Sequence, residues 1–512
     1  MVFKIKHPEI KNNDISVKIN KIYSFQKSID GFESALALLM WDMETYMPKK
    51  GIESRSNSLS IIQEEIHNRF CDKKIFKLIN DILENKTISA KDRFVIERLK
   101  KDIDKQKKIP SKLVSDMAAV APLCVNDWKL ARQKHDFSIV RNNLSKTIDL
   151  KREQIKYVNC LGVPYNSLLD NYEEGITSEK IDKEFSYLKE RLVPLLKKIL
   201  FSKKYIKQQE NQKIVKINKE ILKKACEFVK QKMYLTDDIC RLDSSTHPFT
   251  VRVGKDDARI TTRYEENIPL HSIYATLHEG GHALYELGLP KEYDYTVVGK
   301  FCSFALHESQ SRFFENMIGK NKLFSRIIFE HFKKEVSEYK NVLFEDWFFD
   351  LNKVELQPIR VNSDELTYCF HIILRYELEK KIADGSLRVD DIPKEWGKLS
   401  KELFGYIPKN DLEGCLQDVH WMQGDIGYFP TYLIGSVYSA QLYDTISKNK
   451  KIISDIEKGE LKSVIDWLKD NVHKYGRLYS ADEIIKRACG TGLNAKLFAD
   501  YIEKKYTELY NL

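Results

Sequence analysis

The sequence predicts a large, mainly α-helical fold that carries one small β-hairpin. Glycine and proline are scarce, with 21 and 13 among 512 residues, so few positions interrupt regular helices. Apolar residues recur at three- and four-residue steps, which is the spacing of one face of a helix. One short segment is instead rich in β-branched residues on either side of a Gly/Asp turn, and this pattern indicates a hairpin.

The chain shows no sign of a boundary between separate domains. It contains no internal repeat, no low-complexity tract and no Pro/Gly-rich linker. We therefore expect a single domain over residues 1–512, with a helical N-terminal part of about 1–240 and a motif-bearing part of about 241–512. The Lys/Gln-rich stretch 203–224 carries Ile and Val at helical spacing, so we predict an exposed helix or loop within that domain.

The clearest predicted helix follows a candidate capping residue, Ser178. Its apolar residues then form one stripe at helical steps: Phe185, Leu188, Leu192, Leu195 and Ile199. The predicted hairpin pairs residues 250–253 with 258–264 across a turn at 254–257. A strand edge here could hold an extended peptide by backbone hydrogen bonds, or the hairpin could simply pack on helices at the surface.

Charge and cysteine usage exclude several classes of protein. The 84 Lys and Arg residues interleave with 75 Asp and Glu residues, so the net charge of +9 indicates a solvated surface rather than a nucleic-acid-binding patch. The apolar run Ser34–Trp41 is too short to cross a membrane. The nine cysteines form no Cys-x-x-Cys pair, and residues 1–8 lack the apolar stretch of a signal peptide. We expect a cytoplasmic protein that binds neither nucleic acid nor membranes.

A metal-binding pattern lies in segment 274–287 (YATLHEGGHALYEL), which has helical character. His278 and His282 are four positions apart, so their ring nitrogens can converge on one ion. Neutral imidazoles in this arrangement are typical zinc ligands, and Glu279 is placed to take a proton from a water rather than to bind the metal. The alternative is two helix-surface histidines beside an incidental glutamate.

The two glycines of this segment, Gly280 and Gly281, argue against that alternative. Each costs a helix interior about 1 kcal/mol relative to alanine, which a plain core helix has no reason to carry. A close approach of substrate or of neighbouring backbone would explain them.

Two imidazoles do not complete a catalytic zinc site, so a third ligand must come from elsewhere. The longer zinc pattern with a third histidine is absent, because that position is Gly288. A carboxylate on a second helix is expected, and four candidates are in range: Glu286, Glu292, Glu308 and Glu315. Glu308 follows the apolar run 301–306, which indicates a buried helix, and a buried carboxylate needs a partner. That partner could be the metal or a cation such as Arg312.

Further short motifs occur in a fixed order along the chain. They are His247-Pro248-Phe249, Asp257-Ala258-Arg259-Ile260-Thr261, His307-Glu308-Ser309-Gln310, Ile359-Arg360-Val361-Asn362-Ser363-Asp364-Glu365 and Gly414-Cys415-Leu416-Gln417-Asp418-Val419-His420-Trp421. With segment 278–282 they resemble the motifs of the carboxypeptidase Taq family, and the resemblance covers most of the chain. Segment 41–48 (WDMETYMP) is similar to the family's N-terminal helical motif. One motif departs, since Ser363 stands where the family usually has alanine.

The resemblance implies a zinc metallocarboxypeptidase that releases single residues from peptides with a free C-terminus, with broad specificity. It implies an almost wholly helical fold with a deep groove, a small sheet beside the zinc helix, and a homodimer. It also implies that Glu308 is the third metal ligand. One zinc ion per chain is expected, with cobalt or manganese as alternatives.

The resemblance makes four residues candidates for substrate binding: His247, Arg259, Arg360 and His420. Arg360 would clamp the terminal carboxylate with its guanidinium fork, and His420 would support the oxyanion. Three of them have a structural alternative. His247 could only close a turn before Pro248, and His420 could be a core residue beside Trp421. Arg360 could pair with Asp364.

The predicted mechanism is attack of a zinc-bound water, activated by Glu279, on the scissile carbonyl. Two other functions fit the same zinc helix. One is an endopeptidase or aminopeptidase, and the other is a zinc-binding scaffold without turnover. Glu279 argues against the scaffold, because metal binding alone does not need that residue.

Overall fold

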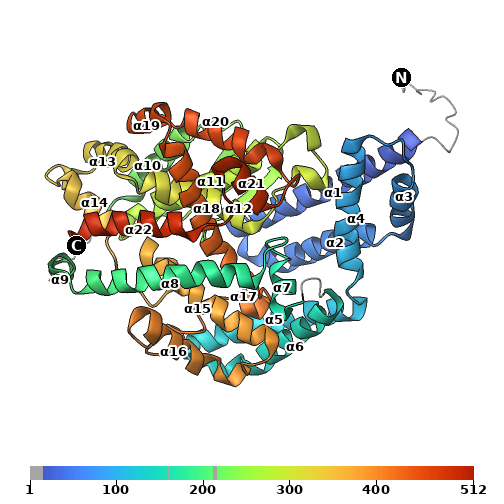
Figure 1. The fold of residues 1–512 in the computed structure, drawn as a ribbon, viewed down its shortest axis with the longest axis horizontal. Coiled ribbons are helices and arrows are strands. Elements are labelled where there is room, and N and C mark those ends of the chain that lie inside the picture. The colour runs from blue at the N-terminus through green and yellow to red at the C-terminus, as the bar shows by residue number, and fades with distance from the viewer. Residues whose placement is uncertain (1–14, 159–161, 211–215) are drawn as a thin grey trace.

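The fold is mainly helical in this computed structural model, which describes residues 15–158, 162–210 and 216–512, and the predicted fold class is confirmed (Figure 1). Before the strands lie α1 (Ile15–Thr45), α2 (Ile52–Phe70), α3 (Lys73–Leu83), α4 (Ala90–Lys107), α5 (Ser111–Lys134), α6 (Arg141–Val158), α7 (Pro164–Leu169), α8 (Ser178–Leu200), α9 (Lys203–Glu210) and α10 (Lys219–Lys232). After them lie α11 (Pro269–Gly288), α12 (Phe304–Arg312), α13 (Lys322–Glu335), α14 (Phe344–Asn352), α15 (Glu365–Asp384), α16 (Ile392–Phe404), α17 (His420–Gln423), α18 (Pro430–Ser447), α19 (Lys450–Glu457), α20 (Lys462–Asn471), α21 (Ala481–Cys489) and α22 (Ala495–Tyr510). None of the helices in the described ranges has the length and apolar character needed to span a membrane.

The three strands form one small sheet of order β1-β3-β2. The predicted hairpin is confirmed, because β2 (Thr250–Gly254) pairs antiparallel with β3 (Asp257–Thr262). The strand β1 (Cys240–Ser244) pairs parallel with β3 and was not predicted from the sequence. Because β3 is central, β2 is an edge strand of the sheet.

The predicted helix after Ser178 is α8, and all five residues of its apolar stripe are buried. Its cap lies one residue earlier than predicted. Thr177 has an extended backbone and its side chain accepts a hydrogen bond from the Lys180 amide, whereas Ser178 is already helical and buried. Stretch 203–224 contains α9 and the start of α10, and residues 211–215 of this stretch lie outside the described residues.

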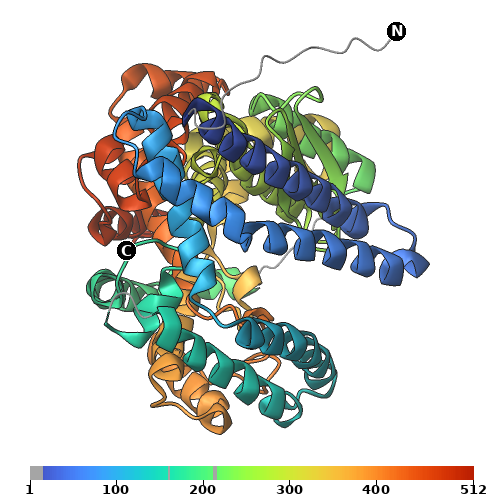
Figure 2. The same ribbon diagram turned by 90° about the vertical axis from the view of Figure 1, so that its right-hand side faces the viewer.

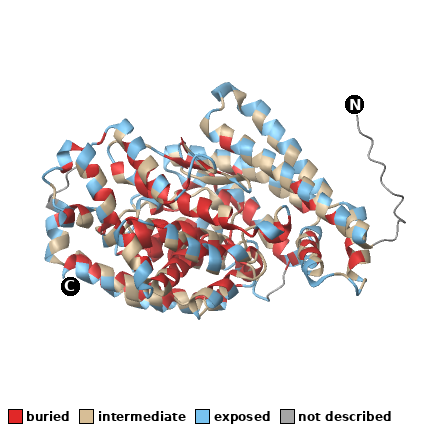
Figure 3. Ribbon diagram, turned by 90° about the horizontal axis from the view of Figure 1, so that it is seen from above, coloured by how far each residue is buried: buried red, intermediate tan, exposed pale blue. Residues whose placement is uncertain are grey.

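Two hydrophobic clusters organise the molecule. The larger one draws on elements from α5 to α22, so it includes residues from both sides of position 240. The smaller one joins α1, α3 and α4 to the segment 293–298. Figure 3 shows the buried residues concentrated in the middle of the molecule, and α2 contributes none of them. The larger cluster joins buried residues between positions 124 and 510 in one core, and one domain over residues 1–512 remains our proposal.

The helices α1 and α2 form a long antiparallel pair that extends along one side of the molecule (Figure 2). The helix α1 contacts β2, and Trp41 near its end is buried against the Arg259 guanidinium, which lies 4.3 Å from the ring centroid. This contact fixes the end of α1, where segment 41–48 begins, to the sheet.

The helix α11 carries the metal-binding pattern and lies among β2, β3, α10 and α12. Its two glycines stand where neighbours approach closely. A Cβ added to Gly281 would lie 2.4 Å from the Gln310 carbonyl oxygen of α12, and one added to Gly280 would lie 2.6 Å from the Met233 sulfur. The neighbouring-backbone explanation of the glycines is therefore confirmed at Gly281.

We expect Gly281→Ala to lower the free energy of unfolding by about 1–3 kcal/mol, because backbone atoms of α12 cannot move aside as a flexible side chain can. Thermal unfolding measures this change. Gly31→Ala is the matched control, since Gly31 is also helical and has nothing within 4 Å of an added Cβ. A Gly281→Ala protein as stable as the Gly31→Ala protein would contradict the prediction.

Candidate metal centre

Three predicted ligand side chains converge between α11 and α12. The Nε2 atoms of His278 and His282 lie 3.7 and 3.6 Å from Oε2 of Glu308. One ligand atom from each of the three residues lies within 4.8 Å of the others. As the sequence predicts, the spacing of four positions on α11 places both imidazoles on one side of the helix, and this side faces α12.

The second nitrogen of each imidazole is held by a hydrogen bond that sets the orientation of the ring. His278 Nδ1 lies 2.9 Å from Glu315 Oε2, and His282 Nδ1 lies 3.0 Å from the His307 carbonyl oxygen. Both partners are acceptors, so Nδ1 donates and Nε2 keeps its lone pair on the side of Glu308. Burial, together with the nearby His307 and His278, holds the pKa of His282 well below its usual value, which favours the neutral form that binds metals.

Glu308 uses its two oxygens differently. Oε1 accepts a hydrogen bond from Arg312 Nε at 2.7 Å, while Oε2 is the oxygen near both imidazoles. The sequence left the metal and a cation as alternative partners for this buried carboxylate. Arg312 binds Oε1, and Oε2 faces the two imidazoles, where it could bind a metal ion. Gly435 of α18 brings the backbone close to this side chain, since a Cβ there would lie 2.8 Å from Glu308 Cβ.

The other three candidate glutamates have different partners. Glu286 lies 3.1 Å from His307 Nε2, and Glu315 holds His278 as described. Glu292 lies 3.7 Å from Lys91 in an exposed pair. Glu315 also contacts Arg312 Nη1 at 3.2 Å and Lys320 Nζ at 3.1 Å, so two cations neutralise the carboxylates around the histidines.

Glu279 follows His278 on α11 and is buried beside the sheet. Its Oε2 accepts a hydrogen bond from the Thr250 hydroxyl of β2 at 2.7 Å. Burial raises the pKa of Glu279, although the neighbouring His278 opposes that shift. The edge strand β2 thus lies directly beside the carboxylate that the sequence predicts to be the general base.

Arg360 lies in a short 3₁₀ helix (Arg360–Asn362) before α15, and its guanidinium is buried. Nε and Nη2 donate to Asp418 Oδ1 at 3.1 and 2.7 Å, and Nη1 donates to the Tyr368 hydroxyl at 3.1 Å. Arg360 therefore pairs with Asp418 rather than with Asp364. Asp364 instead caps α15 by accepting from two backbone amides. Arg375 shares Asp418 from the other side, so one carboxylate lies between two arginines.

His420 lies beside Arg360 in a group of aromatic side chains. Its Nε2 is 3.4 Å from the Tyr432 hydroxyl, and the Arg360 guanidinium lies 5.1 Å from the Tyr432 ring centroid. Burial lowers the pKa of His420 to about 4, so the ring is neutral at neutral pH. Tyr428 packs against His420 with ring centroids 5.4 Å apart.

The remaining two substrate candidates lie on the sheet. His247 is exposed in the loop between β1 and β2, where its carbonyl accepts a hydrogen bond from the Ser245 hydroxyl at 2.6 Å. Arg259 binds Asp257 and covers Trp41. It alternates along β3 with residues such as Thr262, which bonds to α11, so Arg259 lies on the opposite face of the sheet. The structure does not bring these two side chains to the histidine–glutamate cluster.

The sequence analysis named two of the supporting residues. Arg312 was named as a possible partner of Glu308, which the structure confirms, and Glu315 was named as a candidate ligand but holds His278 instead. Two further contacts were not predicted from the sequence: Thr250 holds Glu279, and Asp418 holds Arg360. Thr250 and Asp418 act across long stretches of sequence, which no local pattern indicates.

The donor set fits a catalytic metal ion. Two imidazole nitrogens and one carboxylate oxygen, each oriented by a second hydrogen bond, are the arrangement of a metallopeptidase site. The class defined by fold and site is therefore a helical metallopeptidase.

Comparisons with known proteins agree with this class. A family model described as Carboxypeptidase Taq (M32) metallopeptidase matches residues 21–506. The chain is 34% identical to carboxypeptidase 1 of Bacillus subtilis, covering 96% of this chain and 98% of that protein. It is also 34% identical to thermostable carboxypeptidase 1 of Pyrococcus furiosus, covering 95% and 98%. A crystal structure of M32 carboxypeptidase from Deinococcus radiodurans R1 superposes with a TM-score of 0.93 at 31% identity, covering 97% and 100%. The chain belongs to the carboxypeptidase Taq (M32) family and is a metallocarboxypeptidase.

We expect Glu315→Gln to weaken metal affinity by about 10–100-fold, because the amide is a poorer acceptor for His278 Nδ1 and lacks the charge that draws Arg312 and Lys320. Competition with a chromophoric chelator measures the affinity. Glu330→Gln, at an exposed position of α13, is the control. Equal affinities of the two variants would show that Glu315 does not support the metal ligands.

Proposed function

We propose that the protein is a zinc-dependent carboxypeptidase that releases single C-terminal residues from peptides with broad specificity. The observation that carries this proposal is the convergence of His278, His282 and Glu308 beside the buried Glu279. Two imidazole nitrogens and one carboxylate oxygen form a donor set used by catalytic zinc. Cobalt and manganese accept similar ligands, so they are the alternatives to zinc.

The chain's own residues supply orientation and proton transfer. A zinc ion at these ligands would polarise the scissile carbonyl and lower the pKa of a water to about 7. Glu279 would accept the proton of the attacking water and return it to the leaving amine. The Thr250 hydroxyl, 2.7 Å from Glu279 Oε2, would fix the carboxylate for that transfer.

The edge of β2 supports binding of an extended peptide. Within the described residues no strand pairs with the outer side of β2, and the Thr250 side chain of this strand contacts Glu279. A substrate strand paired with β2 would pass its carbonyl close to the metal ligands. Recognition through the backbone does not depend on side chains, and this supports broad specificity. A deep groove along this edge remains a prediction.

We infer that the terminal carboxylate binds near Arg360 and His420. Arg360, Tyr432 and His420 lie together, and the neutral His420 could donate a hydrogen bond to an oxyanion. Substrate binding by His247 and Arg259 also remains a proposal. The contacts of these two residues described above are made within the sheet and its loops.

We also propose a cytoplasmic homodimer. All eight cysteines in the described part of the chain are free thiols, as in proteins of a reducing compartment. Large apolar side chains are exposed on α1 and α2, among them Leu38, Met40 and Ile61, and such surfaces favour association. A mass in solution of twice 60.0 kDa would support the dimer.

Glu279→Gln should lower kcat by about 10²–10⁴-fold while the protein keeps its metal, because an amide cannot accept the proton. Glu308→Ala should lose the metal as well, since it removes a ligand. Metal content after dialysis and peptide turnover measure the two effects. A Glu279→Gln protein that turns over within a few-fold of wild type would show that another group is the base.

Arg360 should determine the preference for a free C-terminus over an amidated one. We expect Arg360→Ala to lower kcat/KM on free-acid peptides by the equivalent of about 2–5 kcal/mol and to change amidated peptides of the same sequence little. Arg360→Lys keeps the charge but cannot make the paired guanidinium contacts with Asp418, and should recover only part of the preference.

Comparison of free-acid and amidated peptides also distinguishes a role of Arg360 in substrate binding from a structural role. If Arg360 acts only by holding Asp418, both kinds of peptide should lose activity equally and the preference should persist. If wild type cleaves free and amidated peptides equally well, the proposed recognition of a free C-terminus fails.

A further inference from the structure

The N-terminus of α12 is held by two consecutive residues from a distant loop. Tyr172 and Glu173 lie in the loop 170–177 between α7 and α8. The Tyr172 carbonyl accepts a hydrogen bond from the Phe304 amide at 3.1 Å, and Glu173 Oε2 accepts one from the Ala305 amide at 3.1 Å. Glu173 is only 3% exposed, so this contact is deep in the protein.

Together with the N-cap, this loop satisfies the first turn of α12. Ser303 accepts from the Leu306 amide at 3.0 Å, so three successive amides of the turn each have an acceptor. A buried helix start without such partners would be costly. The nine residues of α12 continue directly into a π-helical segment (Phe313–Gly319), and the anchors at the N-terminus of α12 hold the other end of this continuous stretch.

Glu308 lies four positions after Phe304, one turn along the same short helix. Metal ligands must be placed within about 0.2 Å of their ideal distances. A shift of α12 along its axis would therefore move Glu308 away from His278 and His282. The anchor at Ala305 lies on the same helix as Glu308, three positions before it.

The loop also connects to the residues around His420. The Tyr172 hydroxyl donates to Asp425 Oδ1 at 3.0 Å, and the Asp425 amide donates to the His420 carbonyl at 2.8 Å. The Tyr172 ring packs edge-on against Tyr428, with centroids 5.1 Å apart. One loop therefore contacts both the helix of the third ligand and the proposed substrate subsite.

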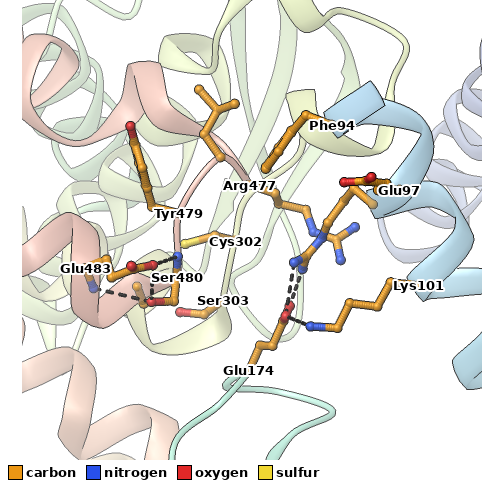
Figure 4. Close-up of a pocket in the computed structure, with 13 residues that line it drawn as sticks. Phe94, Glu97, Lys101, Glu174, Cys302, Ser303, Arg477, Tyr479, Ser480 and Glu483 are labelled. Atoms are coloured by element: carbon orange, nitrogen blue, oxygen red, sulfur yellow. Dashed lines mark hydrogen bonds and ion pairs between the residues drawn. The ribbon is translucent and has the colours of Figure 1, made fainter. Parts of the chain in front are cut away.

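The next residue, Glu174, connects the loop to α4. Glu174 binds Arg98 and Lys101 of α4 across a cavity of about 320 Å³, which Ser303 and Cys302 also line (Figure 4). Glu173 and Glu174 thus point to different elements, one to α12 and the other to α4. This difference provides a comparison within one loop.

We propose that Glu173 is a positioning residue for the metal centre: it fixes the N-terminus of α12 and so places Glu308 for metal binding, while Tyr172 ties the same loop to the substrate subsite. The proposal rests on the proposed metal ligation by Glu308. Burial raises the pKa of Glu173 to about 8, so the carboxyl is mostly protonated at neutral pH and glutamine is a close replacement.

The test measures zinc affinity of metal-free protein by chelator competition. Glu173→Ala should weaken the affinity about tenfold or more, and Glu173→Gln should stay within a few-fold of wild type, because its amide oxygen can still accept from Ala305. Glu174→Ala, which breaks only the contact with α4, should bind zinc like wild type. Thermal unfolding confirms that each variant is folded.

Equal zinc affinities of Glu173→Ala and Glu174→Ala would overturn the proposal, and so would a Glu173→Gln protein as weak as Glu173→Ala. If Glu173→Ala does not fold, Glu173→Asp is used in its place, because the shorter side chain withdraws from the Ala305 amide. The same two outcomes would then overturn the proposal. Tyr172→Phe should keep the zinc affinity and raise KM for peptides. An unchanged KM would contradict the part of the proposal in which Tyr172 links the loop to the substrate subsite.

Zinc binding and peptide cleavage by the wild-type protein distinguish a failure of the proposed function from a failure of the proposal for Glu173. A wild-type protein that binds zinc but cleaves no free-acid peptide contradicts the proposed function and leaves the affinity comparison valid. A wild-type protein that binds no zinc overturns both.

Discussion

The close contact between α11 and α12 is the constraint on which the metal centre depends. Two histidines on one helix and one glutamate on the other can meet only if the helix backbones approach closely at Gly281. That approach buries much of the surface around the ligands, and a buried polar atom is costly to leave unpaired. The hydrogen bonds of Glu315, Arg312 and the His307 carbonyl meet that requirement.

Much of this arrangement could be predicted because it depends on local spacing. Helical steps predicted α8, and β-branched residues around a turn predicted the β2–β3 hairpin. The four-residue spacing of His278 and His282 predicted two of the three donors. The choice of Glu308 among four glutamates came from a family resemblance, because spacing alone left it open.

The rest could not be predicted because it depends on contacts between distant segments. The strand β1 was missed since parallel pairing with β3 has no local signature in five residues. Asp418 lies 58 positions from Arg360, and the nearer Asp364 offered a plausible helical spacing. Asp364 instead caps α15, because its carboxylate accepts hydrogen bonds from two backbone amides at once.

The ion pairs around the histidines also fix the charge of the centre. Glu308 and Glu315 carry two negative charges, and Arg312 and Lys320 carry two positive ones, so these four side chains sum to zero. Beside a divalent ion held by neutral imidazoles, an ionised Glu279 would add one negative charge, so these groups together would carry an excess of one positive charge. Such a field attracts anionic chain ends from solution and weakens as ionic strength rises. The protein's selectivity for a negatively charged terminus would then begin at a distance, before any single residue touches it.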